Sequence, residues 1–247
     1  LTTRSDVHKV VNTLPLSQTL EDSYQEKDSP RLRKTIIELS PPPQGQWMVI
    51  EATETGELLA LADLPYQVGI DPISYQNPSS SSQKADPYCT QAFTYTFAME
   101  ATAQPEPIVP PSFYPQYEAF YSYDKLRYAK TPNLVFTYRR IYSTQKQAKD
   151  VEVATGDISM QNWGGGNDYG PGTSLDNFLY TRQQLAEQGQ LAPSGWKGGL
   201  RVGSLKAGEE VTLGYFYWLV AGTTDSKLDS SLKKPWPNLR FLKGLDS

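Results

Sequence analysis

The sequence predicts an α+β protein, in which a mixed or antiparallel sheet with a few helices is joined by long loops. Its 247 residues include 16 Tyr, 5 Trp and 8 Phe beside 19 Pro and 18 Gly. This mixture favours strands, turns and structured loops over a helical bundle. The apolar segments also lack the regular alternation of strand and helix that is typical of a parallel α/β fold.

The first 70 residues contain short strand signals and too few helical residues for a core of their own. We expect strands at residues 7–11, 35–39 and 47–50, the last of them after the proline-rich loop 41–45. Such a segment is typical of one side of a sheet whose other strands lie elsewhere.

The most informative stretch is residues 47–69. Its apolar run at 48–50 stops at the polar segment 51–57, and residues 56–64 then predict two helical turns that end at Pro65. A buried strand that breaks into small residues at a helix start lets the backbone approach a ligand closely. The alternative is a solvated helix start, in which the acidic side chains are favoured by the helix dipole.

The rest of the chain predicts further strands, long loops and two helices. Aromatic alternation predicts a strand at residues 91–99, and similar patterns predict strands at 134–142 and 239–242. The expected loops are residues 71–88, 104–116 and 155–172. One helix is expected from a capping box at Thr173 and Asp176 to Gly189, and a second from about residue 206 to residue 220.

The composition excludes several classes of function. Cys89 and His8 are the only residues of their types, so we predict no disulfide, no cysteine-built zinc site and no other metal site. We expect Cys89 to be a small buried residue and His8 to lie at the surface. The net charge of −4 argues against a nucleic-acid partner. No run approaches the roughly 18 apolar residues that a membrane span needs.

The loop from Asn162 to Tyr169 has the most unusual local sequence. Three consecutive glycines, Gly164 to Gly166, lose much backbone conformational entropy on folding. Because they have no side chains, they would let the main chain pack directly against a flat aromatic ring. They do not follow a strand, so they are no dinucleotide fingerprint. A ligand-binding loop and a tight loop closed by an Asx turn at Asn167 both remain open.

Arg139 and Arg140 are adjacent in the strand expected at residues 134–142, so their side chains should point to opposite faces. A buried arginine requires a carboxylate or phosphate partner. One of the two therefore faces either a ligand or a structural carboxylate, and the sequence leaves both interpretations open.

Six segments, in the same order, resemble segments of one known family, the FAD-dependent oxidoreductases of the glutathione-reductase-like flavoprotein group. They are VIEATETGELLALADLPYQVG (49–69), QAFTYTFAME (91–100), LVFTYRRIYS (134–143), GDISMQNWGGGNDYG (156–170), GYFYWLV (214–220) and PNLRFLKGLDS (237–247). The resemblance implies two interleaved parts. Residues 1–70 would supply strands and a cofactor-edge segment of an FAD-binding domain, and residues 71–247 would form a substrate domain.

The resemblance also implies roles for individual residues. Six would contact FAD, namely Ala52, Thr53, Gly56 and Glu57 at the cofactor edge and Asn162 and Trp163 near the substrate face of the flavin ring. Apart from these implied contacts, we expect four Tyr and Arg residues to face the ring and bind substrate in such an enzyme, namely Tyr138, Arg139, Arg140 and Tyr169. The implied reaction is hydride transfer from a small-molecule substrate to the flavin, and no catalytic residue is identified.

The chain departs from this family in one important respect, because the strand and G-x-G-x-x-G that hold the pyrophosphate are absent. We therefore expect the FAD-binding portion of the same polypeptide, or a second chain, to supply the rest of the cofactor site. Two other functions remain open. One is a non-catalytic binding module that exposes Trp163, Trp196 or Trp236, and the other is an assembly subunit derived from such an enzyme.

Overall fold

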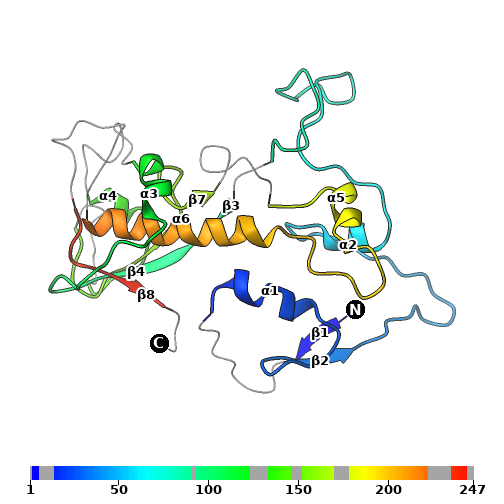
Figure 1. Cartoon of the computed structure of the whole chain (residues 1–247), viewed down its shortest axis with the longest axis horizontal. Helices are drawn as coiled ribbons and strands as arrows, with labels where there is room; N and C mark the ends of the chain where they lie inside the picture. Colours follow the sequence, from blue (N-terminus) through cyan, green and yellow to red (C-terminus); the bar gives the residue numbers. More distant parts are fainter. Residues whose placement is uncertain are drawn as a thin grey trace. The chain divides into compact units, whose positions relative to one another are not determined.

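The computed structural model describes residues 2–5, 14–90, 93–122, 133–145, 152–169, 178–221 and 235–243 (Figure 1). All strand pairs within its sheets are antiparallel, and helices accompany them, which confirms the α+β prediction at this level. The chain divides into two compact units. Unit 1 comprises Leu1–Thr90 and Asp176–Lys206, and unit 2 comprises Gln91–Leu175 and Ala207–Ser247.

Unit 1 contains little regular structure. Strand β1 (Thr2–Ser5) pairs with β2 (Arg33–Ile36), and the helices are α1 (Leu16–Tyr24), α2 (Glu57–Leu61) and α5 (Arg182–Glu187). Residues 62–90 form a long loop that is crossed by isolated bridges between Ile70 and Asp86 and between Pro72 and Ser82.

Unit 2 contains a four-stranded sheet with the order β5-β6-β4-β8. Its strands are β5 (Arg140–Tyr142), β6 (Ile158–Gln161), β4 (Phe97–Ala101) and β8 (Leu239–Leu242). A second, two-stranded sheet joins β3 (Phe93–Thr94) to β7 (Asp168–Tyr169). The helices are α3 (Tyr114–Tyr117), the 3₁₀ helix η1 (Glu118–Phe120), α4 (Leu134–Thr137) and α6 (Val202–Ala221), whose first turn belongs to unit 1.

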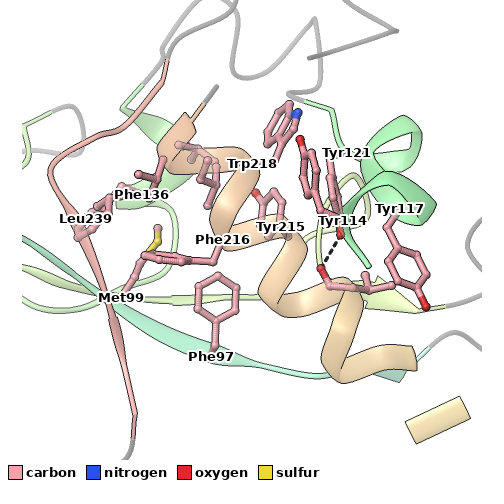
Figure 2. Close-up of a cluster of buried hydrophobic side chains, with 14 of the residues drawn as sticks. Phe97, Met99, Tyr114, Tyr117, Tyr121, Phe136, Tyr215, Phe216, Trp218 and Leu239 are labelled. Carbon is pink, nitrogen blue, oxygen red and sulfur yellow. Dashed lines mark hydrogen bonds between the residues drawn. The ribbon is translucent and has the colours of Figure 1, made fainter. Parts of the chain in front are cut away.

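The core of unit 2 is built around α6, which is buried on nearly all sides. Tyr215 and Trp218 are 0% and 1% exposed, and their rings stack with centroids 6.0 Å apart. Figure 2 shows Phe97 and Met99 of β4 beside this helix, together with Tyr121, whose hydroxyl donates to the Val211 carbonyl at 2.8 Å. Large buried aromatic side chains stabilise a fold by about 1.5–3 kcal/mol each, so this cluster dominates the stability of unit 2.

The strand expected at residues 47–50 is wrong. These residues are not in a strand, and Met48 and Ile50 are 85% and 78% exposed. A strand forms only where another strand satisfies its backbone, and no strand in the part of the chain that the structure describes pairs with these residues.

The strand expected at residues 134–142 is wrong in its first half, where the chain forms α4 before entering β5. The consecutive residues Val135 and Phe136 are both buried. A helical turn can bury two consecutive side chains on one side, whereas a strand sends them to opposite faces.

The helix expected to begin at Thr173 begins instead at Arg182. The capping box is formed by Thr181 and Gln184, while Thr173 and Asp176 lie outside the described residues. The expected end is confirmed, because Gly189 follows the helix with a φ of 70°. The second expected helix is also confirmed as α6, which begins at Val202.

Several smaller expectations have mixed outcomes. The strands at 91–99 and 239–242 are confirmed as β3, β4 and β8, although residues 95–96 interrupt the first. Of the strand expected at 35–39, only residues 35 and 36 lie in β2, which begins at Arg33, and residues 37–39 are not in a strand. The expected loop at 155–172 contains β6 and β7. Cys89 is exposed, which corrects the expectation of burial. The strand at 7–11, with His8, lies outside the described residues.

Candidate functional site

The polar segment 51–57 forms a turn in which side chains accept hydrogen bonds from backbone amides of the turn and of the helix that follows it. The Glu51 carboxylate accepts hydrogen bonds from the backbone amides of Thr53 (2.8 Å) and Leu58 (3.0 Å), and the Thr53 hydroxyl accepts one from the Gly56 amide (3.1 Å). Hydrogen bonds from Thr53 and from the Leu58 amide lower the pKa of Glu51. Gly56 then starts α2 with a φ of 60°, a conformation that favours glycine. Ala52 and Thr53 are left exposed at the outside of the turn.

Glu57, the first residue of α2, connects three segments of unit 1. One carboxylate oxygen accepts a hydrogen bond from the Tyr24 hydroxyl at 2.5 Å, and the other accepts one from the Trp196 indole at 3.2 Å. Burial, and then the Glu57 carboxylate, raise the pKa of Tyr24 far above its ordinary value. A carboxylate has about four acceptor positions, so Glu57 retains capacity for a further donor.

The apolar residues directly before this turn form an exposed surface. Trp47, Met48, Val49 and Ile50 are 50%, 85%, 62% and 78% exposed. Single exposed apolar residues are ordinary, but four in succession are typical of a surface that another element covers. We refer to residues 47–50 as the exposed apolar run.

In unit 2, the loop that follows β6 is held by Asn167, which is 0% exposed. Its side-chain oxygen accepts from the Trp163 amide at 2.9 Å, and its nitrogen donates to the carbonyls of Gln161 (2.9 Å) and Tyr95 (3.0 Å). The Trp163 indole donates to the Ser122 carbonyl at 3.0 Å. These bonds support the tight-loop interpretation, with the Asn167 side chain bonding back to residue 163 rather than forming an Asx turn.

The glycines of this loop serve packing within the unit. A Cβ atom on Gly166 would lie 2.5 Å from the Tyr215 ring, and one on Gly165 would lie 2.6 Å from the Ser122 carbonyl. Gly164 has no such constraint, since its nearest neighbour, Asp168, would be 3.6 Å away. The backbone of this loop therefore does pack against a flat ring, which is the ring of Tyr215 in the protein's own core.

Four of the residues expected at the flavin and substrate lie together in unit 2. The Tyr138 hydroxyl donates to the Asn162 carbonyl, and the Arg139 Nε donates to the Asn162 side-chain oxygen at 3.0 Å. The rings of Tyr138 and Trp163 meet edge to face at 6.2 Å. Burial raises the pKa of Tyr138, so its hydroxyl stays a donor at neutral pH. We call Tyr138, Arg139, Asn162 and Trp163 the Asn162 cluster.

The other two expected substrate residues have structural partners. Arg140 forms an ion pair with Asp157 at 3.3 Å, which supports the structural interpretation of this arginine. Tyr169 is 5% exposed and packs against Phe93 with ring centroids 4.9 Å apart. Neither side chain joins the contacts of the Asn162 cluster described above.

Asp157 is a structural residue that the sequence patterns missed. It is 0% exposed and accepts hydrogen bonds from the Ser143 hydroxyl (3.0 Å), the Thr144 amide (2.9 Å) and the Ala154 amide (3.1 Å). Burial alone would raise the pKa of Asp157, but these hydrogen bonds and Arg140 outweigh burial and lower it. Ser143, Thr144 and Arg140 lie 13 to 17 residues before Asp157, and no local pattern in the sequence marks their convergence on its carboxylate.

A groove of about 620 Å³ lies in unit 1 between residues 66–71, residues 85–88 and helix α5. The two loop segments are joined by reciprocal backbone hydrogen bonds between Ile70 and Asp86, both 3.0 Å long. Gly69 has a φ of 97°, and any side chain there would collide with the Asp86 carbonyl. We call this feature the loop–helix groove. The sequence patterns predicted residues 71–88 only as loop.

Comparison with protein-family models, with curated proteins and with solved structures found no match for this chain. The described residues contain no group of His, Cys, Asp and Glu side chains that could hold a metal ion. None of the helices in the described ranges has the length and apolar character of a membrane span. The turn at residues 51–57, the Asn162 cluster and the exposed apolar run are therefore the candidate functional features of this chain.

Proposed function

We propose that this chain is part of an FAD-dependent oxidoreductase that oxidises a small-molecule substrate by hydride transfer to the flavin. The observation that carries the proposal is the exposed apolar run, which leads directly into the turn at residues 51–57 and the start of α2. A run of this kind has the composition of a central strand, yet no described strand pairs with it. A further sheet is therefore expected to pair with residues 47–50, which would form a strand only once that sheet is present.

The order of this segment suits a dinucleotide site. In sheets that bind dinucleotides, the ligand lies beyond the carboxyl end of a strand, where a turn leads to a helix. Ala52 and Thr53 are small and exposed at this position, so they fit close passage of a nucleotide. The FAD-binding portion of the same polypeptide, or a second chain, would supply the pyrophosphate-binding amides.

The Asn162 cluster is the proposed contact with the flavin ring and the substrate. Trp163 offers a flat ring that is fixed by its bond to Ser122, and Arg139 is an exposed cation held by Asn162. Tyr138 positions Asn162 through the backbone. Bound FAD would accept the hydride, and these side chains would orient a carbonyl or carboxylate group of the substrate. Gly56 and Glu57 remain predicted contacts of FAD, and Arg140 and Tyr169 remain predicted contacts of the substrate.

The two other functions have different support. The indole nitrogen of Trp196 is bonded to Glu57, and Trp236 is partly buried, so these two residues do not form an open platform for an external ligand. This weakens the binding-module alternative. An assembly subunit that has lost catalysis would also present the exposed apolar run, and it remains the second candidate.

Native purification tests the proposal. The protein should be isolated from its source cells without denaturation, and the visible absorption spectrum and the intact mass of the particle should be recorded. We expect flavin bands that co-purify with this sequence, in a longer polypeptide or with a second chain. An intact native particle without flavin would contradict the proposal, and a flavin-free complex with a second chain would favour the assembly subunit.

A further inference from the structure

One carboxylate in unit 1 joins a tyrosine to a tryptophan. The Glu57 Oε1 atom accepts a hydrogen bond from the Tyr24 hydroxyl at 2.5 Å, and its Oε2 atom accepts one from the Trp196 indole at 3.2 Å. The three side chains come from α1, from α2 and from the loop after α5, and all of them belong to unit 1. Only the width of one carboxylate therefore separates the two hydrogen bonds. We call these residues the Tyr24–Glu57–Trp196 triad.

Two adjacent buried glycines pack against the two rings of the triad. A Cβ atom on Gly198 would lie 2.5 Å from the Tyr24 ring, and one on Gly199 would lie 2.8 Å from the Trp196 ring. Both glycines have a positive φ, of 90° and 66°, which favours glycine. Because consecutive Cα atoms are about 3.8 Å apart, the two rings are held close together. Such proximity suits electron transfer between aromatic side chains.

The surroundings of Tyr24 couple its oxidation to the loss of a proton. Burial, and then the Glu57 carboxylate, raise the pKa of Tyr24, so the phenol is protonated at neutral pH. A phenol that loses one electron becomes strongly acidic and must release its O–H proton. A base within hydrogen-bond reach lets the proton leave with the electron. The bond to Glu57 has the short length, about 2.5–2.7 Å, of a hydroxyl that donates to a carboxylate.

Trp196 is the member of the triad that an oxidant can reach through its neighbours. The ring is partly exposed, and the nearby residues Ser194 and Lys197 are exposed. An indole that loses an electron readily releases its N–H proton, and this N–H already donates to Glu57. At neutral pH tyrosine is oxidised at a slightly lower potential than tryptophan. A radical formed on Trp196 is therefore expected to move to Tyr24.

We propose that the Tyr24–Glu57–Trp196 triad is a redox relay that carries a one-electron oxidation from Trp196 to Tyr24. The oxidant is an oxygen-centred radical of the peroxyl class, which takes one electron from Trp196 and becomes its anion, while the indole N–H proton moves to Oε2 of Glu57. One electron then passes from Tyr24 to the indolyl radical. The phenol proton moves to Oε1 of Glu57 as the proton on Oε2 returns to the indole nitrogen. The products are a neutral tyrosyl radical, intact Trp196 and protonated Glu57.

The relay is independent of the proposed oxidoreductase function, because no flavin takes part in either step. Glu57 acts as the proton carrier for both rings, and its two oxygens are already bonded to them. The relay would move an oxidising equivalent from a partly exposed indole to a phenol.

Pulse radiolysis of the full chain in the presence of azide tests this proposal. The azidyl radical takes one electron from tryptophan side chains and becomes the azide ion. We expect a phase, independent of protein concentration, in which the indolyl absorbance decays as the tyrosyl absorbance grows. This phase should be slower in D₂O, because protons move with the electron. Other pairs, such as Trp163 with Tyr138, can give phases of their own, so the relay is the phase that Tyr24→Phe and Trp196→Phe each remove.

Matched variants test the role of the carboxylate. Glu57→Gln should slow the relay phase by about a hundredfold, at the lower end of what a positioned base contributes, because an amide does not take up the proton. Glu54→Gln, which removes an exposed carboxylate of the same turn, and Tyr75→Phe, at a tyrosine that is 99% exposed, should leave the phase unchanged. Far-ultraviolet circular dichroism checks that each variant is folded.

Three results would each overturn the relay. They are identical kinetics in the wild type and Tyr24→Phe, a phase that Glu57→Gln does not slow, and a phase with the same rate in H₂O and D₂O. The comparison of the two solvents needs no substitution, so it decides the question even if Glu57→Gln does not fold.

Discussion

Two short apolar segments of this chain have opposite surroundings. Phe97 and Met99 of β4 are 6% and 0% exposed, whereas Met48 and Ile50 are 85% and 78% exposed. Strand β4 pairs with β6 on one side and β8 on the other, and α6 contributes to the core that buries it. Residues 47–50 have no such neighbours among the described residues. The comparison shows that apolar sequence becomes buried structure only where the covering elements are present.

The largest expected effect concerns the buried side of this comparison. Trp218→Ala removes a side chain that is 1% exposed, and it should lower the free energy of unfolding of unit 2 by about 3–5 kcal/mol through the cavity it leaves. Urea unfolding followed by far-ultraviolet circular dichroism measures this. Leu213→Ala on the same helix, where the side chain is 40% exposed, is the control and should cost less than about 1 kcal/mol. Equal effects would mean that α6 is not buried as described.

The next largest loss of stability is expected at Gly166, whose backbone lies against the Tyr215 ring. Gly166→Ala places a methyl group 2.5 Å from the Tyr215 ring and should destabilise unit 2 by about 1–3 kcal/mol through overpacking. Gly164→Ala, two residues earlier, meets nothing closer than 3.6 Å and should change stability by less than about 0.5 kcal/mol. Thermal melts of the two variants distinguish them. If both glycines tolerate alanine equally, the loop does not pack on Tyr215.

Asp157 gives a pH-dependent effect. Its pKa is lowered in the folded state, so its contribution to stability is present above the ordinary pKa of an aspartate, about 3.9. That contribution is lost as the pH falls through the lowered value of the folded state. Asp157→Asn should cost about 1–3 kcal/mol at neutral pH and much less near pH 2. Urea unfolding at both pH values measures the difference, and a penalty that is the same at both would show that the ionised carboxylate is not what stabilises the fold.

The smallest expected effect on stability lies at the exposed apolar run. Ile50→Asp adds a charge to a side chain that is 78% exposed, so the isolated chain should change its stability by less than about 0.5 kcal/mol. Thermal melts of the variant and the wild type, followed by far-ultraviolet circular dichroism, measure the change. A loss of several kcal/mol would show that this run is already buried within the chain.

Patterns local in sequence predicted much of the fold. Helix α6, strand β8 and the helix end at Gly189 are confirmed because each depends on neighbouring residues. Residues 134–137 were predicted as strand because aromatic and β-branched residues have strand propensity, but the burial of Val135 and Phe136 together favours a helical turn. Tertiary packing decided the outcome there.

The candidate site was less predictable than the fold. Asn162 and Trp163 are expected at the flavin and Tyr138 and Arg139 at the substrate, and the structure brings these four together by hydrogen bonds and ring contacts. Asp157 and the loop–helix groove were missed, because their geometry depends on contacts between residues that are far apart in the sequence. The functions of all of these residues stay predictions.

If a flavin-bearing sheet covers the exposed apolar run, the flavin content of the natively purified protein depends on that run. The measurement compares the visible spectrum of the wild type with those of two variants expressed in the source cells, Ile50→Asp and Ile141→Asp. Ile141 is 60% exposed and lies in unit 2, so it is a matched control. We expect flavin in the wild type and in Ile141→Asp, with little or none in Ile50→Asp. Full flavin content in Ile50→Asp, or none in the wild type, would contradict this expectation.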